Sequence, residues 1–399
     1  MPAEAEQVDT QAHRRTPYDL VVIGAGVVGL ACAWRAAQAG MSVLVLDRDG
    51  PGAGASGVAA GMLAPVTEAD FGEEPLLELN LAARELWSGF AAELEELTGL
   101  PTGYAGDGAL VVAADRDDAE ELRRLHDFQR QLGLEATWLT ARECRELEPG
   151  LAPRVGGAIL APQDGHVDPR AVVRALVAAL ERAGGELITR AEVASLDMDG
   201  GRVRGVRTVD GRRAGARTVL MAAGAWSARG GLAPQGGGPA VRPVKGQLLE
   251  LRVRPGHSPP ARRIVRTPRC YIVTRGRAAA EDGARVVIGA TVEEQGFDTA
   301  VTADAVFRLL EAAWEVLPEV GELELLCARA GLRPGTPDNA PAIGGGGPDG
   351  LLWATGHYRN GVLLAPLTAR TIVDLLRGGA LPEALRPFHP GRFDSSRVA

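Results

Sequence analysis

Gly24-Ala25-Gly26-Val27-Val28-Gly29 joins a short apolar run to a helical pattern. The apolar run, Tyr18 to Ile23, predicts a buried strand, and Val27 to Gln38 has small and apolar residues at helical spacing. A second apolar strand, Ser42 to Leu46, follows and ends at Asp47. Strand, helix and strand in this order predict a βαβ unit that opens a parallel sheet.

The three glycines of this motif have separate roles. Gly24 allows a tight turn after the strand, Gly26 lets the backbone approach a pyrophosphate, and Gly29 allows close packing of the helix on the strand. Asp47 can accept hydrogen bonds from a ribose diol, and its charge disfavours a 2′-phosphate. The motif therefore predicts a bound dinucleotide other than NADP.

The residues that follow Asp47 favour FAD over NAD. Residues 50–57 are rich in glycine, alanine and serine, and small residues continue to Pro65. Small side chains let the backbone lie against a bulky group, which suits an extended diphosphate and an isoalloxazine ring. A second turn of this kind, at Gly224, follows another predicted strand, although an ordinary strand–loop junction would explain it equally well.

Composition is that of a soluble globular protein with room for two domains. The 399 residues are 46% hydrophobic and 24% charged, and the net charge of -8 argues against a nucleic-acid partner. The four cysteines lie far apart without a CxxC pair, which favours reduced thiols in the cytoplasm. We expect no metal site. We also expect no membrane partner, because no segment could span a bilayer, and no signal peptide, because residues 1–17 are polar.

The expected class is α/β with an α+β second domain. Residues 241–300 are rich in β-like runs and favour an antiparallel sheet, whereas the features of a βαβ unit return near Leu351 to Leu376. We therefore expect a second domain inserted into a discontinuous Rossmann-like one. The expected boundaries are a disordered tail over 1–17, an FAD-binding domain over 18–82, 145–228 and 331–385, a substrate and oligomerisation domain over 83–144 and 229–330, and a C-terminal tail over 386–399.

Gly356-His357-Tyr358-Arg359-Asn360-Gly361 places an arginine between two glycines, just before an apolar helix start at Val362. An arginine beside a helix N-terminus suggests anion binding next to the cofactor. Among nucleotide-binding proteins, the motif therefore favours an enzyme that acts on a small carboxylate.

Several motifs, taken in order, resemble those of the D-amino-acid oxidase family of flavoproteins, and in particular its glycine oxidases of thiamine biosynthesis. The resemblance covers residues from about 18 to 385. Its motifs are the first glycine motif with Asp47, Ala60-Gly61-Met62-Leu63, Pro243-Val244-Lys245-Gly246-Gln247, Cys270-Tyr271-Ile272-Val273, Gly289-Ala290-Thr291, Ala330-Gly331-Leu332-Arg333-Pro334-Gly335-Thr336 and the 356–361 segment.

The resemblance implies non-covalent FAD, oxidative deamination with O2 and a homotetramer. It implies that Arg333 and Arg359 bind the substrate carboxylate and that Tyr271 belongs to the substrate site. His357 is expected to be a structural residue of the flavin loop rather than a base. The implied FAD contacts are Val27, Val28, Asp47, Arg48, Ala55, Ser56, Ala60, Gly61, Met62, Val193 and the loop His357, Tyr358, Arg359, Asn360, Gly361, Val362 and Leu363.

Two positions depart from the family pattern. Arg269 stands where a histidine is familiar, and Val292 stands where a methionine is familiar. If both line the pocket, its charge and volume differ from those of a glycine oxidase. Arg269 could equally point to solvent.

The leading hypothesis is an oxidase that deaminates glycine, and secondarily sarcosine and small D-amino acids, by hydride transfer from Cα to flavin N5. Its product would supply thiamine thiazole synthesis. The alternatives are a D-amino-acid dehydrogenase that reduces a quinone, a sarcosine oxidase-like enzyme and a non-catalytic flavin-binding protein. Sarcosine oxidases commonly tether their flavin to a cysteine, and no cysteine follows Cys327 here.

Overall fold

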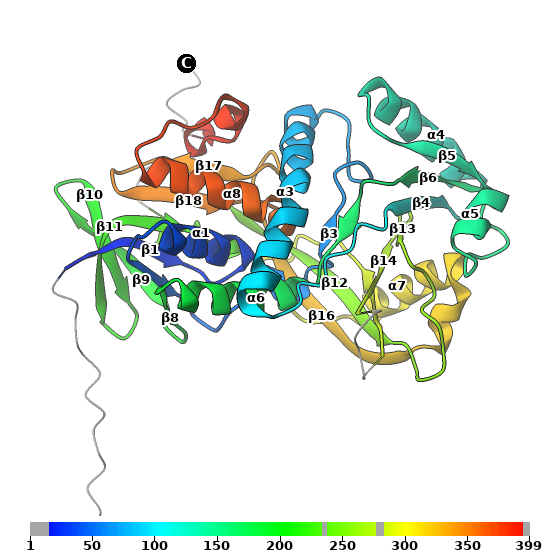
Figure 1. The fold of residues 1–399 in the computed structure, drawn as a ribbon, viewed down its shortest axis with the longest axis horizontal. Helices are drawn as coiled ribbons and strands as arrows, with labels where there is room; N and C mark the ends of the chain where they lie inside the picture. Colours follow the sequence, from blue (N-terminus) through cyan, green and yellow to red (C-terminus); the bar gives the residue numbers. More distant parts are fainter. Residues whose placement is uncertain (1–15, 234–237, 277–282, 394–399) are drawn as a thin grey trace, which may run out of the picture.

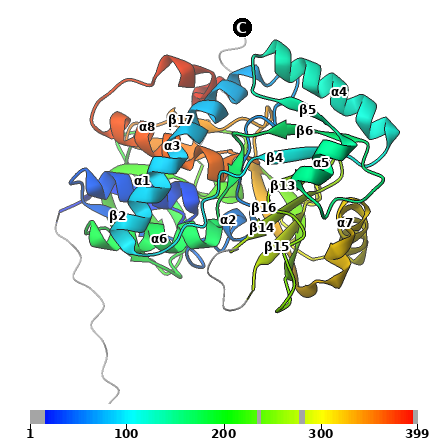
Figure 2. The ribbon, with the colours of Figure 1, turned by 45° about the vertical axis from the view of Figure 1, so that its right-hand side comes forward.

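A computed structural model of the chain describes residues 16–233, 238–276 and 283–393. The molecule has two halves that lie side by side, each built on its own sheet (Figures 1 and 2). The first half is the helix-rich half and contains both ends of the described chain, and the second half contains α4 (Arg116–Gln131), α5 (Ala141–Leu147) and α7 (Ala303–Val316). The N-terminal tail expected over 1–17 lies almost wholly outside the described residues.

The first sheet has eight strands and forms the centre of the helix-rich half. In spatial order they are β17 (Ala342–Gly345), β18 (Leu351–Thr355), β11 (Arg213–Met221), β1 (Tyr18–Ile23), β2 (Val43–Leu46) and β8 (Glu186–Ile188), with β10 (Arg202–Thr208) and β9 (Val193–Asp199) attached through β11. β1 pairs in parallel with β2 and β11, and β11 pairs in parallel with β18. The βαβ unit predicted at the N-terminus is confirmed.

The apolar run of β1 is explained by burial on both faces of the sheet. Leu20 and Val22 join the core beneath the helices, whereas Val21 and Ile23 join the core on the opposite face, beneath β9 and β10. This alternation follows from the two-residue period of a strand, and it leaves β1 without a polar face.

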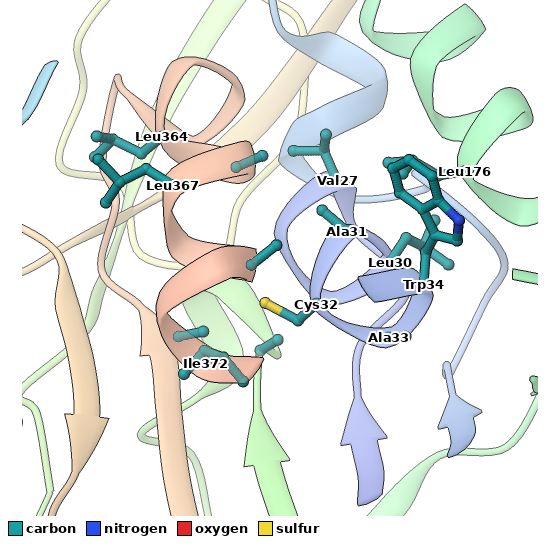
Figure 3. Close-up of a cluster of buried hydrophobic side chains, with 14 of the residues drawn as sticks. Val27, Leu30, Ala31, Cys32, Ala33, Trp34, Leu176, Leu364, Leu367 and Ile372 are labelled. Carbon is teal, nitrogen blue, oxygen red and sulfur yellow. The ribbon is translucent and has the colours of Figure 1, made fainter. Parts of the chain in front are cut away.

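Helices cover one face of the first sheet. They are α1 (Val27–Gln38), α3 (Glu74–Thr98), α6 (Pro169–Arg182) and α8 (Gly361–Leu376). In Figure 3, Cys32 of α1 points towards α8, and Trp34 lies beside Leu176 of α6. Nine of the twelve residues of α1 are buried, which is why its sequence lacks a polar stripe.

The second sheet also has eight strands and is largely antiparallel. Its strands in spatial order are β16 (Glu324–Gly335), β12 (Arg242–Arg252), β15 (Arg285–Gly289), β14 (Tyr271–Arg275), β13 (Ile264–Arg266), β4 (Ala109–Ala113), β6 (Gly157–Ala161) and β5 (Thr137–Thr140). The antiparallel pairings of β12, β14 and β15 confirm the prediction for residues 241–300.

The remaining elements complete the described chain. They are α2 (Ala55–Val58), β3 (Met62–Leu63), α4 (Arg116–Gln131), α5 (Ala141–Leu147), β7 (Gly165–His166), α7 (Ala303–Val316), and the 3-10 helices η1 (Gly224–Trp226), η2 (Pro318–Glu322), η3 (Glu383–Phe388) and η4 (Pro390–Phe393).

Three expected domain boundaries do not match the elements. The boundary at 82/83 falls inside α3, a continuous helix that packs against α6 and α8 of the first half. β6 was expected in the first domain, but it pairs with β4 and β5 in the second sheet. The C-terminal tail was expected from 386, but the described chain remains packed to 393, because Phe388 is buried and Arg392 pairs with Asp338 at 2.8 Å.

Candidate active site

A cavity of about 570 Å³ lies at the carboxyl ends of the parallel strands of the first sheet. Ligands of open α/β sheets bind at this edge. The cavity is lined from the first half by the β1–α1 turn, the end of β2, residues 53–62 and the turn after β11. Tyr271, Ala290 and Arg333 line it from the second half.

The glycines of the first turn have the roles that the sequence predicts. Gly24 has φ of +107°, a conformation that favours glycine. A Cβ on Gly29 would lie 2.1 Å from the carbonyl oxygen of Gly24, so only glycine lets α1 start this close to β1. Gly26 lies at the start of α1 and lines the cavity.

Asp47 and Ser56 fix the loop around this turn. One carboxylate oxygen of Asp47 accepts from the backbone N–H of Ala25 at 2.7 Å, and the other accepts from Asp49 at 2.9 Å. The Ser56 hydroxyl accepts from the backbone N–H of Val27 at 3.0 Å. The Ser56 hydroxyl oxygen therefore already accepts from the first backbone N–H of α1. The first turn of this helix carries no acidic side chain.

Arg333 reaches the cavity from the end of β16. Its Nη1 donates to the carbonyl oxygens of Thr291 at 3.0 Å and Lys245 at 3.3 Å. A Cβ on Gly246, in the neighbouring strand β12, would lie 2.4 Å from the guanidinium nitrogens. Gly246 therefore provides the space in which this side chain lies.

Tyr271, the first residue of β14, lines the same part of the cavity. Its hydroxyl packs over Gly289 of β15, where a Cβ would lie 2.4 Å from that oxygen. Burial raises the pKa of Tyr271, and the nearby Arg333 guanidinium opposes part of that rise. The phenol is thus a neutral hydrogen-bond donor beside a cation.

The 356–361 loop brings Tyr358 and Arg359 to the cavity. Tyr358 has φ of +47°, a strained conformation for a residue with a side chain. Arg359 is exposed and lies with its guanidinium carbon 5.4 Å from the centre of the Tyr358 ring. Arg333 is therefore the more deeply placed of the two predicted carboxylate ligands.

His357 is buried between this loop and α8. One of its ring nitrogens, Nε2, lies 3.1 Å from the Thr368 hydroxyl. Burial lowers the pKa of His357 to about 3, so the ring is neutral near pH 7. A group with this pKa is a poor general base near neutral pH.

The chain matches the family model described as DAO, FAD dependent oxidoreductase, over residues 19–375. This chain belongs to the FAD-dependent oxidoreductases. It is 35% identical to a glycine oxidase of Geobacillus kaustophilus over 93% of this chain and 96% of the relative. A putative thiamine biosynthesis oxidoreductase, ThiO, of Rhizobium etli is 36% identical over 88% of this chain and 94% of the relative.

The fold agrees with this family. The crystal structure of the glycine oxidase from Geobacillus kaustophilus superposes with a TM-score of 0.86 at 35% identity, covering 94% of this chain and 99% of that one. The resemblance to the D-amino-acid oxidase family, the fold class and FAD as the cofactor are confirmed.

The cavity fits FAD in the features that the sequence predicts. The backbone donors of α1 and the absence of a first-turn acid suit a diphosphate, and Asp47 at the end of β2 suits a ribose. Most of the predicted FAD residues line this one cavity. They are Gly24, Gly26, Val27, Val28, Gly29, Asp47, Arg48, Ala55, Ser56, Ala60, Gly61, Met62, Val193, Gly224, His357, Tyr358, Arg359, Gly361 and Val362.

Four predicted residues lie outside the cavity lining. The Arg269 side chain pairs with Glu315 of α7, and Val292 is 62% exposed. Both side chains lie on the surface of the second half, and neither lines the cavity. Asn360 and Leu363 support the loop from behind: Asn360 accepts a backbone hydrogen bond from Leu364, and the Leu363 carbonyl accepts from Trp87 Nε1 at 2.8 Å.

Glu68 also lines the cavity near Tyr271, although no pattern in the sequence predicts it. Glu68 pairs with Arg266 at 3.3 Å, so its charge is offset by a cation of β13. No local motif marks Glu68, because its place depends on the contact of residues 64–68 with the second sheet. Gly246 and Gly289 belong to motifs that were recognised, but their spacing role appears only in three dimensions.

Among residues 16–233, 238–276 and 283–393, no three histidine, cysteine or acidic side chains gather as metal ligands would. Within the same ranges, no helix has both the length and the hydropathy needed to cross a membrane.

Proposed function

We propose that the chain is a glycine oxidase, which converts glycine, O2 and water to glyoxylate, ammonia and H2O2. Sarcosine and small D-amino acids would be secondary substrates that give the corresponding 2-oxo acid and amine or ammonia. The observation that carries the proposal is that Arg333 and Tyr271 enter the FAD cavity from the second sheet, beside the glycine-rich turn of the first. The names of the relatives agree with it.

The residues of this chain would bind and orient the substrate. The planar guanidinium of Arg333 suits a bidentate pair with a carboxylate, and the neutral Tyr271 hydroxyl can donate to the same group. Bound FAD would supply the chemistry by accepting a hydride at N5 from the substrate Cα and passing the electrons to O2. Orientation of this kind is worth up to roughly 7–11 kcal/mol of the barrier.

The positions of Arg269 and Val292 support a small substrate. Both were expected to alter the pocket if they lined it, and both lie outside its lining. The remaining lining near Tyr271 includes Ala290 and Ala60, which are small. The positions of these two side chains are therefore compatible with glycine as the substrate.

A substrate panel with two readouts tests the proposal. The FAD-loaded protein is mixed anaerobically with glycine, sarcosine or D-alanine, and bleaching of the flavin absorption is recorded. Aerobic H2O2 formation is then measured with the same substrates. Reduction of an added artificial dye by these substrates, without formation of H2O2, would instead support the D-amino-acid dehydrogenase. Failure of every small amino acid to bleach the flavin would support a non-catalytic protein.

The proposal extends to the setting of the reaction. It places the protein in the cytoplasm as a homotetramer that supplies dehydroglycine to thiamine thiazole synthesis, with FAD held non-covalently. It assigns FAD binding to the half built on the first sheet, and substrate binding and oligomerisation to the half built on the second. Light scattering tests the tetramer, and a colourless acid precipitate with yellow supernatant is the result expected for non-covalent FAD.

A further inference from the structure

Residues 291–302, which we call the strap, connect β15 to α7 and form no strand of their own. The start of the strap is fixed to β12 by a pair of backbone hydrogen bonds. The N–H of Lys245 donates to the carbonyl of Glu293 at 2.9 Å, and the N–H of Glu293 donates to the carbonyl of Lys245 at 3.0 Å.

Two buried side chains of the 243–247 motif hold the rest of the strap. Lys245 and Gln247 are each 1% exposed. Lys245 Nζ donates to Asp298 at 2.6 Å, and the Gln247 amide binds Glu293 at 2.7 Å and the backbone N–H of Thr302 at 2.8 Å. A buried ammonium is stable only when it is paired, so this motif fixes the strap at both ends.

The strap carries Phe297 across to the first half of the molecule. The Phe297 ring centre lies 5.6 Å from that of Trp226 in η1, and the guanidinium carbon of Arg229 lies 4.9 Å from the Phe297 ring centre. The guanidinium carbon of Arg48, at the end of β2, lies 4.5 Å from the Trp226 ring centre. Phe297 therefore joins a chain of two rings and two cations.

The other three members of this chain line the cavity, whereas Phe297 is not part of the lining. Asp47 and Val193 line the same end, where the carboxyl end of β2 would meet the nucleotide part of a bound dinucleotide. Two guanidinium groups at this end favour an anionic ligand. Arg229 lies against the Phe297 ring, whereas Arg48 lies against the Trp226 ring and also pairs with Asp49 at 2.8 Å.

We propose that Phe297 is a positioning residue for FAD retention: the strap holds its ring against Trp226 and Arg229 and so fixes the groups that line the nucleotide end of the cavity. The proposal rests on membership of the FAD-dependent oxidoreductases and does not depend on which amino acid is the substrate. It also gives the Lys245 and Gln247 motif a role, because these side chains set the position of the strap.

Titration of the apoprotein with FAD, followed by quenching of flavin fluorescence, tests the proposal without any substrate. Loss of a ring pair and a cation–π contact should raise the Kd for FAD about tenfold in Phe297→Ala and roughly threefold in Phe297→Leu. Phe297→Tyr keeps the ring and should retain the original Kd. Val301→Ala is the matched control, because Val301 lies in the same strap and is also 41% exposed.

A second variant tests the ion pair that attaches the strap to β12. Asp298→Asn removes the charge that pairs with Lys245 and should also raise the Kd for FAD, by less than Phe297→Ala. An unchanged Kd in Phe297→Ala, or equal weakening in Val301→Ala, would overturn the proposal. The apoprotein Tm of each variant is measured in parallel, and if Phe297→Ala does not fold, the comparison of Phe297→Leu with Phe297→Tyr decides.

Discussion

The backbone N–H of Tyr358 donates a hydrogen bond to the carbonyl oxygen of Pro334 at 3.0 Å. Each partner is the chain neighbour of one predicted substrate arginine, Arg359 or Arg333. The bond joins the loop before α8 to the end of β16, so the main chain fixes the distance between the two halves of the proposed carboxylate site. This arrangement predicts that Arg333, the more deeply placed arginine, contributes more to substrate binding than Arg359.

Arg333→Ala should raise KM for glycine about 100-fold while FAD stays bound, because a charge-assisted bidentate pair is lost. Steady-state kinetics and the visible flavin spectrum measure the two effects. Arg269→Ala is the matched control on the surface of the second half and should leave KM unchanged. Release of FAD from Arg333→Ala would show instead that this arginine supports the fold through its bonds to Thr291 and Lys245.

Gly29→Ala should abolish FAD binding and lower the free energy of unfolding by about 3 kcal/mol. Its Cβ would lie 2.1 Å from the Gly24 carbonyl, so α1 must move away from β1. Gly50→Ala is the control from the same cofactor region, because its Cβ would meet no atom within 4 Å. Urea denaturation and FAD titration compare the two; equal behaviour would refute the packing role of Gly29.

His357 should make stability depend on pH in a defined direction. Its folded pKa, about 3, lies below the ordinary value of 6.5, so the unfolded chain binds more protons between these values. The free energy of unfolding therefore falls as the pH drops below 6.5. Between about pH 7.5 and about pH 5.5, the fall should be smaller in His357→Gln by about 1.4 kcal/mol. Urea denaturation of both apoproteins measures it, and identical pH slopes would contradict the assignment.

Trp87→Phe should lower the free energy of unfolding by about 1–3 kcal/mol, because the hydrogen bond from the buried indole to the Leu363 carbonyl is lost. This bond joins α3 to the first turn of α8, directly behind the flavin-side loop. Trp314→Phe is the control, since Trp314 is 56% exposed, and should change stability by less than about 0.5 kcal/mol. Similar losses in both variants would argue against the hydrogen bond as the cause.

Much of the first half could be predicted from the sequence, because its signals are local. A strand, a glycine turn and a helix within Tyr18 to Gln38 specify the βαβ unit without help from the rest of the chain. The antiparallel strands of 241–300 were also recognisable, since β14 and β15 each contain three consecutive apolar residues and β12 contains Leu248, Leu249 and Leu251.

β16 was not predicted, although it carries Arg333. Its N-terminal part is largely exposed and its end contains Gly331, Pro334 and Gly335, which read locally as turn residues. Its pairing with β12 over the full length of the strand overrides those signals. β17 was missed for a similar reason, because Gly344 and Gly345 belong to a glycine-rich run that indicates a loop.

The site residues also fall into two groups, those that the sequence identifies and those whose place depends on contacts between distant parts of the chain. Those of the glycine turn could be identified from spacing, and Arg333, Arg359 and Tyr271 could be identified from family resemblance. The place of Arg269 could not, because its ion pair with Glu315 joins residues far apart in the sequence. Glu68 could not be identified either, since its partner Arg266 lies on a strand of the other half.

The division of the cavity lining between two sheets has an evolutionary consequence. The glycine turn and Asp47 come from the first sheet, whereas Tyr271 and Arg333 come from strands of the second. If Tyr271 and Arg333 bind the substrate as proposed, mutations in β14 or β16 can change which substrate is accepted while the cofactor turn stays intact. A lineage can acquire new substrates on this scaffold one strand at a time, under selection that never has to rebuild the flavin site.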